Sequence, residues 1–158
     1  MRMTLKQRWL RCLPAGLILA ALVLLIVWLV QPRAFSDVIR SDGAEEFYVY
    51  TSSVETEREL LSARPNREEM EPLLALLKEG TLRLTGRSRT IQWQIEDTLY
   101  HLSFYHGEDG IWVQDASFDL CTDGMVYISH DWLGYLCYEL SGCDMGAIGA
   151  QLEQMLGM

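Results

Sequence analysis

The histidines of the chain stand among many carboxylates, so a metal site or a general base is the first chemistry to consider. The three are His101, His106 and His130. Neither an H-E-x-x-H pattern nor an EF-hand loop occurs around them. Asp115, Asp119 and Asp123 recur every four residues, but they cross a predicted strand and turn, where their side chains do not converge. We therefore predict no metal site and no cofactor.

Nucleophilic catalysis has no recognisable motif either. Ser129, His130 and Asp131 are the residue types of a triad, but consecutive residues point in different directions and cannot form the relay. The run from Gly86 to Thr90 lacks the closing glycine of a nucleophile elbow. There is no P-loop and no dinucleotide fingerprint. We predict no catalytic residues; a hydrolase without a motif would need a cleft in which a histidine lies beside a carboxylate.

Three cysteines follow the N-terminal segment: Cys121, Cys137 and Cys143. In sequential strand order Cys121 and Cys137 lie two strand spacings apart, about 9.5 Å, which exceeds the roughly 7 Å that a disulfide tolerates. A turn at Ser141 and Gly142 favours a Cys137–Cys143 disulfide. The alternative is three reduced, half-buried thiols, a common state of small hydrophobic cysteines. No C-x-x-C pattern supports a redox or zinc role.

The N-terminal segment is basic and then apolar. We predict that residues 1–12 form a short cytoplasmic tail. The 18 residues that follow, from Leu13 to Val30, carry no charge. As a helix this run spans roughly 27 Å, close to the hydrocarbon core of a bilayer. We expect a single-pass anchor in the cell membrane at residues 13–30, a linker at 31–42 and an extracytoplasmic domain at 43–158. A cleaved signal peptide is the alternative, although its apolar core is usually shorter.

Acidic residues dominate the rest of the chain. The formal net charge is −9, and residues 91–158 hold 11 acids without a lysine or arginine. Nucleic acid is excluded as a partner, because phosphates require a basic surface. An acidic surface suits a basic envelope or membrane protein, whereas ordinary solubility is the alternative explanation.

Periodicity predicts the elements of the domain. Alternating residues predict a strand at 47–51, and a helix begins after Asn66, which can cap it together with Glu69, and ends at Gly80. Pro72 either kinks this helix or marks its start. A final amphipathic helix begins after Asp144, with an apolar side of Met145, Ile148, Leu152 and Met155.

The positions of candidate turns and of apolar residues on either side of them predict the sheet between the helices. A loop at 86–89 pairs Leu84 with Ile91, and a turn at 97–98 pairs the strand at 91–95 with that at 100–104. A turn at 122–124, with Gly124 left-handed, pairs Leu120 with Val126 and Phe118 with Ile128. Lost alternation near Asp115 predicts a bulge, and 134–140 is the last strand.

These elements predict an α+β domain, an antiparallel meander sheet with helices on one face, after a transmembrane helix. The second face would carry tyrosines and polar side chains, which suit protein contacts because aromatics bury much area at small entropic cost. The candidate partner-binding residues are His101, Tyr105, Asp119, Tyr127 and Trp132. A covering segment is the alternative for this face, and Trp132 is either a contact residue or a plug for the core edge.

The layout resembles small uncharacterised single-pass or secreted extracytoplasmic domains of Gram-positive bacteria. The resemblance covers residues 36–157 and rests on a Leu-rich helical turn, Leu73-Leu74-Ala75-Leu76-Leu77, and a Tyr-rich strand, Leu99-Tyr100-His101-Leu102-Ser103-Phe104-Tyr105. It implies an extracytoplasmic domain with no established activity and no catalytic residues.

The sequence therefore favours a membrane-anchored, non-enzymatic domain that binds a neighbouring protein. The other hypotheses are an inhibitor or immunity-type domain acting on an envelope enzyme, an envelope hydrolase without a motif, and a structural accessory of the anchor.

Overall fold

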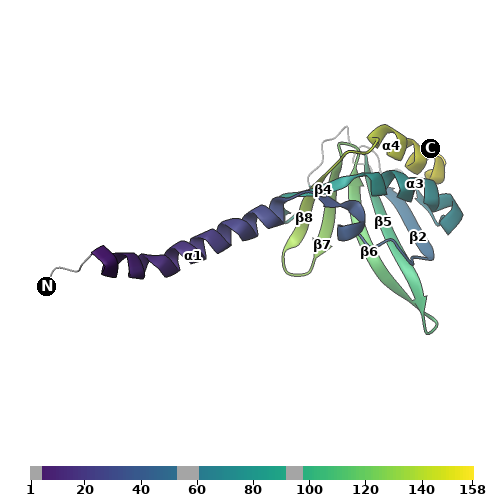
Figure 1. Ribbon diagram of the computed structural model, residues 1–158. Coiled ribbons are helices and arrows are strands. Elements are labelled where there is room, and N and C mark those ends of the chain that lie inside the picture. The colour runs from purple at the N-terminus through teal and green to yellow at the C-terminus, as the bar shows by residue number, and fades with distance from the viewer. Residues whose placement is uncertain (1–4, 53–60, 92–97) are drawn as a thin grey trace. The chain divides into compact units, whose positions relative to one another are not determined.

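The computed structural model describes residues 5–52, 61–91 and 98–158, which belong to two compact units, Met1–Gln31 and Pro32–Met158. The first unit contains one helix, α1 (Leu5–Val30) (Figure 1). Within the described residues, no helix combines the length and the apolarity that crossing a membrane requires. Spanning a bilayer takes about 20 predominantly apolar residues. The single-pass anchor predicted from Leu13 to Val30 is therefore wrong.

The second unit is built on one eight-stranded antiparallel sheet with the order β1-β4-β8-β7-β6-β5-β2-β3. Its strands are β1 (Arg33–Ala34), β2 (Glu46–Ser52), β3 (Ser62–Ala63), β4 (Thr81–Ser88), β5 (Leu99–Glu108), β6 (Ile111–Cys121), β7 (Met125–His130) and β8 (Gly134–Ser141). Strands β5 to β8 form the predicted meander, since each pairs with the next along the chain. The α+β class and the antiparallel sheet are thus confirmed.

Local turn chemistry sets the register of this meander. Gly124 has a φ of +89° and closes the β6–β7 turn, and Leu120 pairs with Val126 as predicted. The predicted bulge is also present: Phe104 pairs with Ala116 and Tyr105 with Gln114, which leaves Asp115 as the extra residue of β6. The bulge turns the outer part of β6 relative to its inner part.

The hairpin predicted at Gly86 to Arg89 is wrong. Strand β4 lies at the far side of the sheet, where Leu84 pairs with Tyr138 of β8, and it continues through the expected loop at Gly86 to Ser88. Strand β5 pairs with β2 and β6, whereas the second predicted hairpin pairs it with residues 91–95. Trp93 and Ile95 of that prediction lie outside the described residues.

Two helices cover one face of the sheet (Figure 1). Helix α3 (Arg67–Glu79) begins with the predicted capping box: the Asn66 side chain accepts from the Glu69 N–H, and the Glu69 carboxylate accepts from the Asn66 N–H. It continues through Pro72, so the helix does not start there. Helix α4 (Met145–Leu156) is capped by Asp144, as expected.

The main core lies between these helices and the sheet. Leu73, Leu74 and Leu77 of α3 and Ile148 and Leu152 of α4 are almost fully buried against the sheet. The unit also takes in residues expected in a linker, because Phe35 at the start of α2 (Phe35–Val38) and Ile39 are buried in the same core. The rings of Phe35 and Phe118 meet edge to face with centroids 5.7 Å apart.

Candidate functional site

Three of the five predicted binding residues, His101, Asp119 and Tyr127, share one cross-strand row. Tyr50 of β2 pairs with His101, His101 with Asp119, Asp119 with Tyr127, and Tyr127 with Cys137. Antiparallel pairing puts directly opposed side chains on the same face. The structure therefore brings His101, Asp119 and Tyr127 together, as the sequence predicted.

Hydrogen bonds connect His101 to three neighbours. Its Nδ1 lies 2.8 Å from Oδ1 of Asp119, and its Nε2 lies 3.0 Å from the hydroxyls of both Ser103 and Ser117. The two hydroxyls are 3.2 Å apart. With a carboxylate at Asp119, Nδ1 donates to it and Nε2 is left to accept from a hydroxyl. This is the connectivity of an acid–base relay, which the sequence did not reveal.

The network is half-buried, and the His101 side chain at its centre is 23% exposed. Asp119 is 9% exposed and Tyr127 is 4% exposed, and the Tyr50 ring stacks on His101 at 4.4 Å. Burial, followed by the Asp119 charge, raises the pKa of the Tyr50 hydroxyl. A partner would find little of Asp119 and Tyr127 to touch. The row is better described as a polar ladder that crosses five strands, β2, β5, β6, β7 and β8, than as a contact surface.

Tyr105 lies farther along the same face, in a small aromatic group. Its ring meets that of Tyr48 edge to face at 5.5 Å, and the guanidinium of Arg64 lies 4.5 Å from the centre of the Tyr48 ring. A cation over an aromatic ring is held by the ring quadrupole. This contact fastens the segment after β3 to the sheet.

The other two histidines stand apart from His101. Nδ1 of His106 lies 2.7 Å from Oδ1 of Asp115, the bulged residue, and its Nε2 lies 3.9 Å from Glu108. Nδ1 of His130 accepts from the N–H of Trp132 at 3.4 Å. Ser129, His130 and Asp131 therefore form no relay. Two histidines do lie beside a carboxylate, which is one half of what the hydrolase hypothesis requires.

The predicted Cys137–Cys143 disulfide is absent. Cys137 lies on the second face in a small cluster with Leu99, Cys121 and Tyr127, whereas Cys143 packs against the main core on the other face. Both Cys137 and Cys143 are free thiols, and burial raises the pKa of each. The turn after β8 leads the chain toward α4, so the second cysteine does not return to the first.

Large apolar side chains are exposed at one end of the sheet. We call it the hairpin end: it carries the β5–β6 turn at Asp109 and Gly110 and the β7–β8 turn at residues 131–133. Trp132 is 90% exposed, Ile111 68% and Trp112 50%, and Val113 and Leu133 are also exposed. Trp132 is thus a tip residue and not a plug. The exposure of Ile111 and Trp112 could not be predicted from the sequence, because both residues continue a strand pattern.

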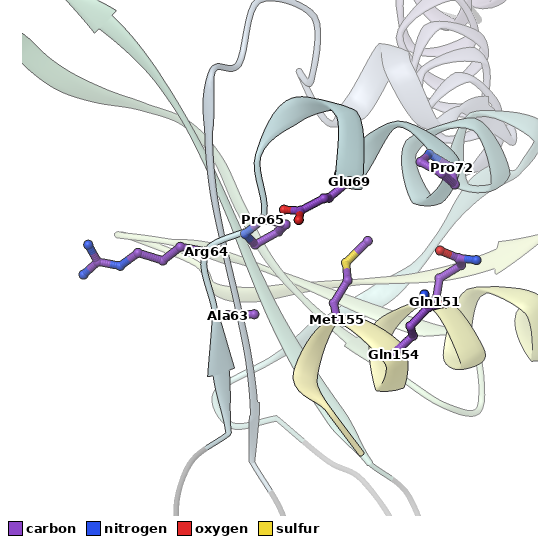
Figure 2. A pocket seen from close by; sticks show the side chains of 8 residues that line it. All are labelled: Ala63, Arg64, Pro65, Glu69, Pro72, Gln151, Gln154 and Met155. Carbon is purple, nitrogen blue, oxygen red and sulfur yellow. The ribbon is translucent and has the colours of Figure 1, made fainter.

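A first cavity, of about 500 Å³, lies between α3, α4 and the segment after β3 (Figure 2). Met155 points into it, Pro65 and Pro72 form apolar walls, and Gln151 and Gln154 supply amides. The Arg64 side chain extends away from the cavity. Glu69 also borders it, but its carboxylate already accepts from the N–H of Asn66. The lining is mixed and carries no relay.

A second cavity, of about 600 Å³, opens between β6 and β7, and we call it the gap cavity. Its lining comes from residues 38–40 after α2, residues 114–117 of β6, and Ile128, Ser129 and Asp131. Both strands belong wholly to the described part of the chain, and their register holds two pairs, Asp119 with Tyr127 and Leu120 with Val126. The predicted pairing of Phe118 with Ile128 is therefore wrong, because the strands have already separated there.

The described residues thus offer a half-buried polar ladder, an exposed apolar hairpin end and a break in the sheet between them. No protein-family model, no curated protein and no solved structure matches this chain.

Proposed function

We propose that the unit Pro32–Met158 is a non-enzymatic protein-binding domain whose contact surface is the hairpin end. The observation that carries this proposal is the exposure of Trp132, Trp112 and Ile111 at one end of a unit that has a continuous buried core. Tryptophans dominate binding energy at protein interfaces, because they bury a large rigid area at small entropic cost. Exposed tryptophans at the tips of two hairpins are costly unless something covers them.

The charge around these tips indicates the kind of partner. Glu108, Asp109 and Asp131 stand at the two turns, and no lysine or arginine occurs between residues 91 and 158. An apolar patch with an acidic rim complements a partner that has apolar pockets and a basic rim. Rim charges act mainly on association, so binding should weaken as salt rises.

Quantitative co-purification tests the proposal. The tagged full-length chain and the double variant W112S/W132S are used to capture proteins from native cells at low and high salt. Leu61→Ser is the matched control, because Leu61 is also an exposed apolar residue but does not belong to the hairpin end. We expect one stoichiometric partner, lost about tenfold in the double variant and retained in the control. Equal recovery with all three proteins would contradict the proposal.

An inhibitor or immunity-type role is a narrower form of the same proposal. The acidic rim supports it, since an acidic surface can block a basic enzyme groove. The captured partner would then be an enzyme, and adding one equivalent of the purified chain would abolish its activity. Full activity at saturation would remove this narrower form.

A second candidate function, acyl hydrolysis, is favoured by one observation. Ser117 both lines the gap cavity and lies 3.0 Å from Nε2 of His101, which in turn contacts Asp119. A fluorophosphonate probe would label a nucleophilic serine in such a relay. Labelling that disappears in Ser117→Ala would establish the hydrolase, and no labelling of the folded chain would eliminate it.

A further inference from the structure

The sheet has a break beside the hairpin end. Strands β6 and β7 separate after two residue pairs, and Figure 1 shows them spreading apart toward their turns. Both strands are described in full. From Asp119 toward the β5–β6 turn, β6 pairs only with β5, and from Tyr127 toward the β7–β8 turn, β7 pairs only with β8. Two strand edges therefore face one another across the gap cavity. Such edges carry rows of backbone donors and acceptors that are ready to pair with another chain.

We propose that the gap cavity binds an extended peptide segment of the partner, which adds as a strand along β6 or β7 and carries basic side chains. This inference rests on the proposed function, because it specifies how the hairpin end engages its partner. Strand addition supplies affinity through main-chain hydrogen bonds, and pockets for alternate side chains supply specificity. Strand addition also explains why the β6–β7 pairing ends at Asp119 and Tyr127 while both strands continue.

The walls of the gap cavity divide the peptide side chains into two sets. Val38, Ala116 and Ile128 offer an apolar surface, and Ser117 and Ser129 offer hydroxyls. Because successive side chains of a strand point to opposite faces, every second residue of the peptide would meet the apolar wall. Ile39, which is 2% exposed, closes the cavity toward the core and limits how deep the peptide can sit.

The charges at the cavity argue for basic residues in the peptide. Asp115 and Asp131 line it against one base, Arg40, and the Asp115 carboxylate is aimed by the bulge and hydrogen-bonded to His106. The turn residues Glu108 and Asp109 add to the negative side. A lysine or arginine on the peptide would face these carboxylates. A second copy of this chain is disfavoured as occupant, because its formal net charge of −9 is of the same sign.

Hydrogen exchange of the full chain tests the proposal directly. The probes are short synthetic peptides in which Lys or Arg alternates with Val or Thr. One control peptide carries N-methyl groups on the alternating residues, which blocks strand pairing but keeps the side chains, and another has Glu in place of the basic residues. We expect the basic peptides to slow exchange of the amides at residues 113–117 or 128–130 at least tenfold. The N-methylated and acidic peptides should not slow it.

Substitutions in the gap cavity test whether the peptide binds there. Asp131→Asn should weaken binding of the basic peptide about fivefold or more, whereas Glu71→Gln, on the exposed side of α3, should leave binding unchanged. Ala116→Phe narrows the gap cavity, and Ser117→Ala removes one hydroxyl from its wall. The A116F variant should abolish the peptide's protection of these amides from exchange, provided that its unfolding midpoint equals that of the parent.

Several results would overturn the inference. These are no protection by any basic peptide, equal protection by the N-methylated peptide, or protection that grows with protein concentration in the absence of peptide, which would identify a second copy. If W112S/W132S still loses its captured partner while the peptides fail, the binding domain stands and only strand addition is wrong. If capture is unchanged in the double variant, the proposed function itself fails.

Discussion

Oδ1 of Asp119 lies 2.8 Å from Nδ1 of His101, directly across the β5–β6 pairing, and it gives one nitrogen of a half-buried imidazole a hydrogen-bond partner. The other ring nitrogen is satisfied by Ser103 and Ser117, so both nitrogens have partners. Asp119→Ala leaves one nitrogen without a partner. An unsatisfied buried polar group costs about 1–3 kcal/mol, and the His101 side chain is 23% exposed. We therefore expect a loss near the lower end, about 1 kcal/mol, in the free energy of unfolding, measured by urea denaturation.

Asp131→Asn is the control for this measurement, because Asp131 is an exposed carboxylate in the β7–β8 turn. Exposed charges contribute little to stability, so its midpoint should move by less than about 0.5 kcal/mol. If Asp119→Ala is as stable as Asp131→Asn, the ladder does not stabilise the sheet.

The capping box of α3 provides a second prediction. Asn66→Ala removes an acceptor at 3.0 Å from the Glu69 N–H and should cost about 1 kcal/mol in unfolding free energy. Asn66→Ser retains a capping oxygen, so this variant should recover most of the loss. Thermal unfolding followed by circular dichroism measures both, and equal melting temperatures for the two variants would contradict the role of the cap.

Two glycines provide a third prediction with opposite signs. Gly134 has a φ of +76°, and a Cβ there would lie 2.6 Å from the carbonyl oxygen of Ser88, so Gly134→Ala should destabilise the protein by about 1–3 kcal/mol. Gly149 lies inside α4, where a Cβ meets nothing within 4 Å. Gly149→Ala should stabilise the protein by about 0.5–1 kcal/mol, because glycine is a poor helix former. Denaturation midpoints of both variants check the pair.

Local signals were sufficient for some parts of this fold. The cap at Asn66, the cap at Asp144 and the turn at Gly124 each depend on residues a few positions apart, so the sequence predicted them correctly. The position of β4 could not be predicted in this way. Thr81 pairs with Ser141, sixty residues later, and nothing near Thr81 encodes that partner. The Asp109-Gly110 turn was a missed local signal, since both residues have positive φ, at 50° and 81°.

The candidate site was likewise predictable only where local signals determine it. Alternation along each strand placed His101, Asp119 and Tyr127 on one face correctly, since side chains have a period of two. Their burial could not be predicted, because it depends on which segments pack over that face. Ile91, for example, packs against the cluster of Leu99 and Cys137. The gap cavity was equally hidden, since alternation continues through Ile128 although the pairing has ended.

Buried tyrosine hydroxyls and cysteine thiols should make the folded protein less stable at alkaline pH. Burial raises the pKa of the hydroxyls of Tyr50, Tyr100 and Tyr138 and of the thiols of Cys137 and Cys143. The folded chain therefore keeps protons that the unfolded chain has already released. Stability falls with rising pH wherever the unfolded state binds fewer protons. We expect stability to be level below the ordinary thiol pKa of 9.0 and to decline above it, more steeply above the ordinary tyrosine pKa of 10.0.

Urea midpoints between pH 7 and pH 11 measure this decline, and two variants assign it. Tyr138→Phe removes a titrating hydroxyl whose pKa is raised by burial, so its midpoint should fall less between pH 9 and pH 11 than that of the parent. Tyr100→Phe removes another hydroxyl whose pKa is raised by burial, so its midpoint should also fall less than that of the parent. Identical slopes for Tyr138→Phe and the parent would show that the decline comes from the net charge of the chain rather than from this buried group.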